Sequence, residues 1–289
     1  MHGRSMVVTD LDGTLFQSNH RVSPRNLRTL EELGRDGVLR AIATGRNLYS
    51  ARKALPEDFP VDYLLFSSGA GVMEWPGQRL LRAISMDPHQ ARRAFAVLAE
   101  RGVDFMLHRP IPESHRFLYY KRGLRQNPDF ESRLIVYAQF AVAGDIARLP
   151  AEPACQLVVV EPPEVQPSAY ESLRAELSGF TVIRTTSPLD GCSRWIEIFP
   201  PQVSKSQAAA WLARERQVQP DGILAVGNDY NDLDLLQWAP KACLVGGCSA
   251  ELLGRFPLVS RGEEADFAEA VEDWRKQRHA DAGRRRGAL

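Results

Sequence analysis

The stretch MVVTDLDGTL, residues 6–15, decides the fold, because a short apolar run leads directly into two carboxylates. Its valines suit a strand buried on both faces of a parallel sheet. Ligands of open α/β sheets lie just beyond the carboxyl ends of such strands, so Asp10 and Asp12 are expected to point into a site. Gly13 allows close approach of the backbone. Two carboxylates this close repel each other unless a cation neutralises them, and oxygen ligands suit Mg2+. An ordinary Asp-Gly turn is the alternative for this stretch alone.

Strand and helix patterns alternate on both sides of a middle third that has a different pattern. Up to about residue 83 and again after about residue 199, short apolar runs alternate with helical stretches. This alternation is typical of a doubly wound parallel sheet. Residues 84–198 instead combine strand runs, helical faces and proline-rich joints. We therefore predict an α/β protein with a Rossmann-like core, residues 1–83 and 199–289, and an inserted α+β domain, residues 84–198.

The bulk composition argues against several classes of protein. Among the 289 residues, Lys+Arg 36 balances Asp+Glu 36, so no overall charge attracts nucleic acid. No apolar run is long enough for a bilayer span, and no signal-like segment precedes residue 6. We expect a cytoplasmic protein without a nucleic-acid or membrane partner. The four cysteines form no CxxC pair, which does not favour zinc. From Arg275 onward the chain is polar and basic, and we expect a frayed, solvated terminus rather than a site for an acidic partner.

Four short polar stretches lie at predicted strand ends or at a helix start. Besides Asp10 and Asp12 they are Thr44, Lys205 and the acidic loop 228–232. Taken singly, Thr44 and the loop acids could cap helices, and Lys205 could be solvated. A cation in the first turn of a helix, however, opposes the helix macrodipole. Their occurrence together in this order favours a single site.

This order of motifs resembles the haloacid dehalogenase-like (HAD) phosphatase superfamily, specifically its Cof-type members with a large α/β (type IIB) cap. The matching residues are DLDGT at 10–14, ATGR at 43–46, IEI at 196–198 through Lys205, and GNDYND at 227–232. The resemblance covers nearly the whole chain. It implies a core-and-cap fold and phosphoryl transfer through an aspartyl-phosphate.

The resemblance also implies a role for each matched residue. Asp10 would be the nucleophile, and Asp12 would be the general acid and then the general base. Thr44 would hold phosphoryl oxygens, and Lys205 would neutralise the nucleophile and the phosphate. The remaining candidates for binding substrate or phosphate are Gly13, Thr14, Gly45, Arg46, Ser68 and Asn231. The candidate Mg2+ ligands are Asp10, Asp12, Asn228, Asp229 and Asp232. The candidates for contact with the leaving group in residues 84–198 are His108, Arg109, His115, Arg116, Arg194 and Trp195.

One position departs from the family pattern. Asn228 stands where an Asp is usual, and Asp229 follows it. An Asn carbonyl can ligate Mg2+ but removes one negative charge, so either Asn228 or Asp229 could be the third ligand.

The resemblance favours a Mg2+-dependent phosphatase that acts on a small phosphate monoester, such as a sugar phosphate, as a monomer or homodimer. The carboxylate at Asp12 favours an ester whose leaving group needs a proton. A phosphomutase or other phosphotransferase with the same intermediate is one alternative. A non-catalytic protein that binds a phosphorylated metabolite is the other.

Overall fold

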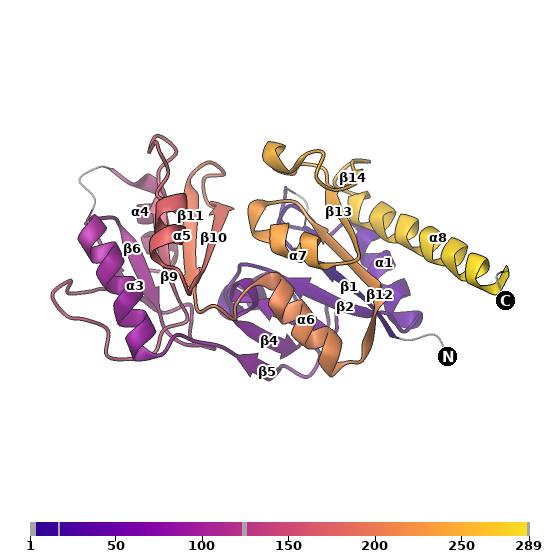
Figure 1. Cartoon of the computed structure of the whole chain (residues 1–289), viewed down its shortest axis with the longest axis horizontal. Helices are drawn as coiled ribbons and strands as arrows, with labels where there is room; N and C mark the ends of the chain where they lie inside the picture. The colour runs from indigo at the N-terminus through magenta and orange to yellow at the C-terminus, as the bar shows by residue number, and fades with distance from the viewer. Residues whose placement is uncertain (1–3, 17, 123–125, 288–289) are drawn as a thin grey trace.

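A computed structural model describes residues 4–16, 18–122 and 126–287, and its strands form two separate sheets (Figure 1). The first sheet has eight strands. In order across the sheet they are β14 (Leu258–Val259), β13 (Lys241–Val245), β12 (Val218–Gly227), β1 (Arg4–Thr9), β2 (Leu39–Ala43), β3 (Tyr63–Phe66), β4 (Gly71–Glu74) and β5 (Arg79–Ala83). Strands β14 to β3 are parallel to their neighbours, whereas β4 and β5 add an antiparallel edge.

Helices cover both faces of this eight-stranded sheet. On one face Val7 of β1 belongs to the same buried cluster as Leu30. The helices of that cluster are α1 (Pro24–Arg35), α2 (Leu48–Ala54) and α8 (Asp266–Gly287). On the other face Val8 clusters with Leu212, and the helices are α6 (Lys205–Glu215) and α7 (Leu233–Trp238). Successive residues of β1 thus enter opposite cores, as a strand buried on both faces requires. The predicted doubly wound α/β core is confirmed.

The second sheet has six strands drawn from the middle of the chain. In order they are β10 (Thr181–Thr186), β11 (Arg194–Phe199), β9 (Gln156–Glu161), β6 (Phe105–His108), β7 (Phe117–Tyr120) and β8 (Ala141–Ala143). All pairs are antiparallel except β7 with β8. Helices α3 (Pro88–Arg101) and α5 (Tyr170–Glu176) pack on one face, and α4 (Pro128–Val136) packs on the other. The two sheets thus form two lobes (Figure 1).

The chain passes between the lobes twice, after β5 and after β11. A short 3-10 turn, η1 (Ser67–Gly69), and the next residue lie against both crossings. The Ile84 backbone N–H donates to the Ala70 carbonyl at 2.8 Å. A Cβ atom on Gly69, whose φ is +96°, would lie 2.4 Å from the Ser204 carbonyl oxygen. Only glycine fits this backbone conformation and this close approach without displacing the second crossing.

The C-terminal stretch differs from the sequence expectation. Instead of fraying from Arg275, the chain continues helix α8 to Gly287. Arg275 forms ion pairs with Glu32 at 3.3 Å and Asp36 at 2.6 Å, which tie α8 to α1. The expectation that the chain frays from Arg275 was wrong, because Arg275 pairs with acids in and just after α1. Among the described residues, every helix is too short or too polar to cross a bilayer.

Candidate active site

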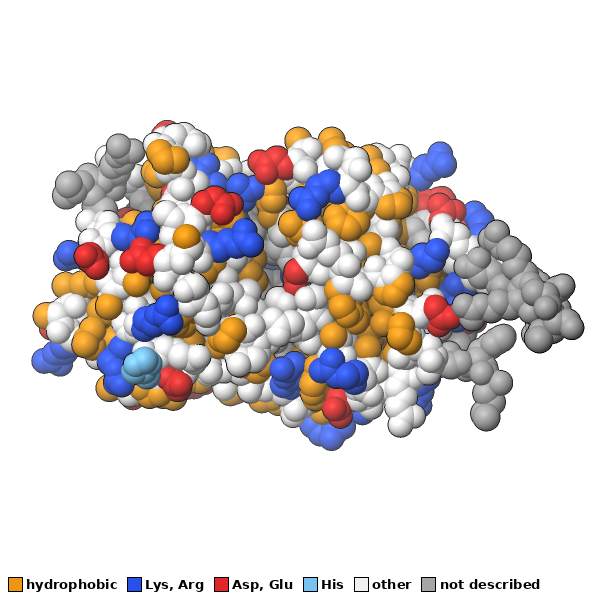
Figure 2. Space-filling view, in the orientation of Figure 1, with side chains coloured by type: hydrophobic (Ala, Val, Ile, Leu, Met, Phe, Trp, Pro, Cys, Tyr) orange, Lys and Arg blue, Asp and Glu red, His pale blue; other side chains and the backbone are white. Residues whose placement is uncertain are grey.

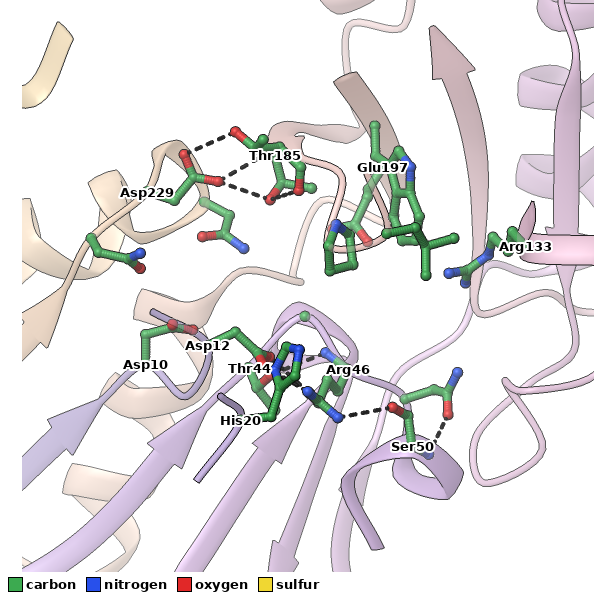
Figure 3. A pocket seen from close by; sticks show the side chains of 18 of the residues that line it. Asp10, Asp12, His20, Thr44, Arg46, Ser50, Arg133, Thr185, Glu197 and Asp229 are labelled. Carbon is green, nitrogen blue, oxygen red and sulfur yellow. Dashed lines mark hydrogen bonds and ion pairs between the residues drawn. The ribbon is translucent and has the colours of Figure 1, made fainter. Parts of the chain in front are cut away.

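A cavity of about 600 Å3 lies between the two lobes, at the carboxyl ends of the core strands. Figure 2 shows the narrow cleft on one face, with acidic and basic side chains interspersed around it. In Figure 3, Asp10 and Asp12 lie on one side of the open space and Arg133 lies on the opposite side. Both lobes therefore contribute lining residues, as a site with a cap requires.

Lys205 holds two carboxylates together at the core side of the cavity. Its Nζ donates to Asp10 Oδ1 and to Asp232 Oδ1, each at 2.6 Å, and its side chain is fully buried. Burial alone would lower the pKa of Lys205, but the two carboxylates outweigh it and raise the pKa above its ordinary value. Burial and the neighbouring Asp232 raise the pKa of Asp10, against the effect of Lys205. The single positive charge of Lys205 therefore faces the two negative charges of Asp10 and Asp232, so this group of three residues carries a net negative charge when both acids are ionised.

The local sequence explains why Lys205 occupies this unusual position. Ser204 caps helix α6 by accepting from the Gln207 backbone N–H at 3.2 Å, so Lys205 is the first helical residue. A cation there is disfavoured by the helix dipole. The two carboxylates, which lie at the end of β1 and in the loop after β12, offset that cost.

Arg46 engages Asp12, the second carboxylate of the first motif. Arg46 Nε and Nη2 donate to the two Asp12 oxygens at 2.8 and 2.7 Å. Such bidentate pairs are the stronger kind of charged hydrogen bond and fix the orientation of the carboxylate. Arg46 was predicted to bind phosphate or substrate. In this structure its guanidinium also reaches Ser50 Oγ at 3.4 Å, and it lines the cavity beside Asp12.

Thr44 and Ser68 connect the core to the cap sheet. Thr44 Oγ1 accepts from the Arg46 backbone N–H at 3.1 Å, and Thr44 O accepts from the Ser68 N–H at 3.0 Å. The Ser68 hydroxyl donates to Glu197 Oε2 of β11 at 2.9 Å, within the buried part of the interface. A Cβ on Gly45 would lie 3.7 Å from both Ser68 Oγ and Asn231 Nδ2. The structure thus brings Gly45, Ser68 and Asn231, which were predicted to bind phosphate or substrate, close to one another.

In the loop after β12, Asp232 bonds within the core and Asp229 bonds to the cap. Asp232 Oδ2 accepts from the backbone N–H groups of Asn228 and Asp229 at 2.9 and 3.1 Å. Asp229 Oδ2 accepts from Thr185 Oγ1 and the Thr186 N–H of β10, both at 3.1 Å (Figure 3). Asp229 therefore faces the cap, and Asp232 fixes the loop and Lys205.

Asn228 faces the first motif instead. Its Oδ1 accepts from Thr14 Oγ1 at 3.0 Å. A Cβ atom on Gly13, whose φ is +74°, would lie 2.3 Å from Asn228 Nδ2. Only glycine lets the Asp12–Gly13 backbone approach Asn228 so closely. The structure thus brings Asn228 to the first motif and turns Asp229 away from it.

The oxygens around Gly13 fit Mg2+ in their chemistry. Among the described residues no cluster of three or more His, Cys, Asp or Glu side chains is arranged to hold a metal ion. A set made of the Asp10 carboxylate, the Asp12 backbone carbonyl and the Asn228 amide oxygen needs only one acid side chain. Hard oxygen donors of this kind, completed by water, are typical of Mg2+. The predicted ligand assignments stay predictions.

The cap side of the cavity contains residues that the sequence did not single out. Of the six candidates proposed for residues 84–198, Trp195 lines the cavity, whereas His108 and His115 lie away from it. Arg133 and Gln156 line it as well, and so does Glu197, which lies in a matched motif but had no assigned role. The sequence around Arg133 gives no sign that this helical residue lines the cavity. Its burial depends on strands that lie far away in the chain.

Comparison with known proteins supports this architecture. The family profile of haloacid dehalogenase-like hydrolases matches residues 7–265. The HMP-PP phosphatase of Cronobacter sakazakii (strain ATCC BAA-894) is 24% identical over 281 residues, covering 94% of this chain and 96% of its own.

Two solved structures have a similar fold. The HAD subclass IIB sugar phosphatase BT4131 superposes with a TM-score of 0.71 at 15% identity, covering 93% of this chain and 98% of its own. BT1666 from Bacteroides thetaiotaomicron gives a TM-score of 0.72 at 18% identity, covering 94% and 96%. The predicted core with a type IIB cap is confirmed. The chain is therefore an enzyme of the haloacid dehalogenase-like hydrolase family, the family that the order of its motifs predicts.

Proposed function

We propose that this protein is a Mg2+-dependent phosphatase that hydrolyses a small phosphate monoester through an aspartyl-phosphate on Asp10. The observation that carries the proposal is the buried ion-pair triad of Asp10, Lys205 and Asp232 at the core side of the cavity. A carboxylate held there by a cation can approach a phosphate dianion, which repels an uncompensated anion. The relatives called phosphatases support the same reaction class.

In the first step an Asp10 oxygen bonds to phosphorus while the bond from phosphorus to the ester oxygen breaks. Asp12 gives its proton to that departing oxygen, and Lys205 and Thr44 balance the charge on the phosphoryl group. In the second step Asp12 removes a proton from water, which attacks phosphorus and releases phosphate and the Asp10 carboxylate. Bound Mg2+, held by Asp10, the Asp12 carbonyl and Asn228, would supply further positive charge.

The Arg46–Asp12 pair bears on this cycle. Both Asp12 oxygens accept from Arg46 in this structure, so neither is free to hold the proton that the leaving oxygen receives. The first step needs a protonated Asp12, so binding of substrate must displace Arg46 from at least one oxygen. Arg46 is then free to contact the phosphoryl group, the role predicted for it.

We also propose that residues 84–198 act as a cap that recognises the leaving group. Strands of the core sheet come from residues 4–83 and 218–259, and those of the second sheet come from residues 105–199. Lining residues of the cavity come from both parts, including Arg133 and Trp195 of the second. The substrate is then a phosphorylated cytoplasmic metabolite, such as a sugar phosphate, and the protein works as a monomer or homodimer.

The test is a panel of phosphorylated metabolites incubated with the purified full chain and Mg2+, with released inorganic phosphate measured. We expect turnover of at least one ester, loss of turnover with excess chelator and recovery with Mg2+. Phosphate released to water, with none transferred to an added sugar phosphate, separates hydrolysis from mutase chemistry. Full turnover in excess chelator, or no turnover of any ester including p-nitrophenyl phosphate, would contradict the proposal.

A further inference from the structure

Arg133 places a buried guanidinium at the cap side of the cavity, opposite Asp10 (Figure 3). Its side chain comes from α4 and the residue is 7% exposed. Arg133 Nε has no hydrogen-bond partner. Within the described part of the chain, no hydrogen bond or ion pair involves its terminal nitrogens either. Only Nε is fully buried, so the terminal nitrogens open onto the cavity that the side chain lines, where a ligand can accept from them.

Aromatic rings fix the position of this guanidinium without satisfying it. The Arg133 Cζ atom lies 4.3 Å from the centroid of the Trp195 ring and 5.1 Å from that of Tyr137. Stacking on rings stabilises the cation but leaves the N–H groups at its edge free to donate. The arrangement is therefore a rigid fork whose donors lack protein acceptors.

The nearest carboxylates are already engaged elsewhere. Asp129 accepts from Ser187 Oγ at 2.7 Å and from Trp195 Nε1 at 2.6 Å, so each of its oxygens has a donor. Glu197 accepts from Ser68 Oγ and forms no ion pair with Arg133 within 4.0 Å among the described residues. Neither acid therefore neutralises the fork by direct contact.

Gln156 is a second unsatisfied group on the same wall. It is 5% exposed, lines the cavity, and its Oε1 atom has no hydrogen-bond partner. An amide oxygen in this position accepts from a hydroxyl or amine. The cap side of the cavity thus presents a fork of donors and an unpaired acceptor, and one polar end of a ligand can bind both.

We propose that the substrate carries a second anionic group, a carboxylate or a phosphate, remote from its scissile phosphoryl group, and that Arg133 binds it. This inference rests on the proposed phosphatase function and specifies its substrate class. Gln156 accepts from a hydroxyl of the same ligand. The fork geometry favours an anion with two oxygens in one plane, since guanidinium matches such groups bidentately.

Matched esters that differ only at the distal end test the proposal. The pairs are glycerol 3-phosphate with 3-phosphoglycerate, sorbitol 6-phosphate with 6-phosphogluconate, and fructose 1-phosphate with fructose 1,6-bisphosphate. The first two pairs test a carboxylate and the third tests a phosphate. We expect kcat/KM to be about 10- to 100-fold higher for the anionic member of at least one pair.

Variants of two stacked arginines show whether Arg133 causes the preference. Arg133→Met removes the charge and keeps much of the volume, and should lower the anionic-to-neutral ratio of kcat/KM by about tenfold or more. Arg133→Lys keeps the charge, loses the fork and should give an intermediate ratio. Arg93→Met is the control, because Arg93 stacks on Phe180 in the same lobe but outside the cavity. It should leave the ratio unchanged.

Three results would overturn the inference or its basis, and they are distinguishable. Equal kcat/KM within all three pairs for the wild-type chain overturns the inference whether or not the variants fold. An unchanged ratio in a folded Arg133→Met does the same. Absence of turnover on p-nitrophenyl phosphate and on every ester overturns the proposed function itself.

Discussion

The two sides of the cavity differ in whether their buried polar groups have hydrogen-bond partners within the protein. On the core side, Lys205, Asp10 and Asp232 satisfy one another at 2.6 Å. On the cap side, Arg133 and Gln156 are also buried but have polar atoms without protein partners. Buried polar groups in folded proteins are normally hydrogen-bonded, so the second pattern is the exception.

The difference separates polar groups that the protein pairs internally from polar groups that remain available to a ligand. The core side is a closed ion-pair network, suited to a group that every substrate shares. The cap side keeps donors and acceptors open, as a surface that recognises one particular ligand does. The predictions below test that division, starting with the largest expected effect.

Asp10→Asn should remove turnover on every substrate, by on the order of 10⁴-fold or more, because the amide cannot form the bond to phosphorus. No covalent phosphoenzyme should be detected by intact-protein mass spectrometry. Asp58→Asn, an exposed position, is the control and should retain full activity. A phosphoenzyme that persists in Asp10→Asn would move the nucleophile elsewhere.

Asp12→Asn should lower the rate on alkyl phosphates by ~10²–10⁴-fold, because the leaving alkoxide no longer receives a proton. An aryl phosphate, whose leaving group barely needs that proton, should be partly rescued in the first step. Phosphoenzyme should then accumulate, since water is no longer activated. The measurement is single-turnover kinetics on one alkyl and one aryl ester. Equal losses on both would assign Asp12 a structural or metal-binding role.

Asn228→Ala and Asp229→Ala should differ in their Mg2+ requirement. Loss of the Asn228 oxygen should raise the Mg2+ concentration for half-maximal activity by roughly tenfold or more. Asp229→Ala removes hydrogen bonds to Thr185 and Thr186 instead, so it should alter KM with little effect on the Mg2+ requirement. Titrating each variant with Mg2+ decides between them. The reverse order would make Asp229 the ligand.

Lowering the pH should reduce the free energy of unfolding, because His108 is buried in its neutral form near Arg133. Burial, aided by Arg133, lowers the pKa of His108 to about 3, and its neighbours include His115 and the Ser114 carbonyl. The unfolded chain, with a pKa of 6.5 for this group, binds more protons below that pH. Stability from neutral His108 is therefore complete above pH 6.5 and is lost as pH falls. From pH 7 to 5.5 the loss should be about 1 kcal/mol.

Denaturant unfolding of the wild type and His108→Asn at these two pH values measures this effect. The asparagine retains a donor for the Ser114 carbonyl but does not titrate, so its pH dependence should be flatter. His89→Asn, at an exposed position, should behave as the wild type does. Parallel pH curves for all three chains would show that His108 is not the responsible group.

The sequence predicted the core side far better than the cap side, for a physical reason. Asp10 and Lys205 stand at a strand end and a helix start, where local pattern and position in a parallel sheet imply that they meet. Arg133 lies on a short helix, and the residue pattern of that helix does not predict its contact with Trp195, about sixty residues later. The contacts that bury it are set by the antiparallel pairing of β9 with β11.

The same limit explains the smaller differences in the fold. Strands β4, β5, β6 and β8 were not predicted, because each is held by pairing with a neighbouring strand that its own short run does not reveal. Asn228 and Asp229 are adjacent, and their separate orientations depend on Thr14 and on β10. Sequence alone therefore could not choose between them.

The turn at Gly69 has a mechanical consequence. Residues 69 and 70 contact both chain crossings, so this one turn holds the two connections between the lobes together. A methyl group at Gly69 would lie 2.4 Å from the Ser204 carbonyl oxygen, and Ser204 directly precedes Lys205. A glycine outside the cavity therefore shapes the backbone that carries the lysine of the buried ion-pair triad.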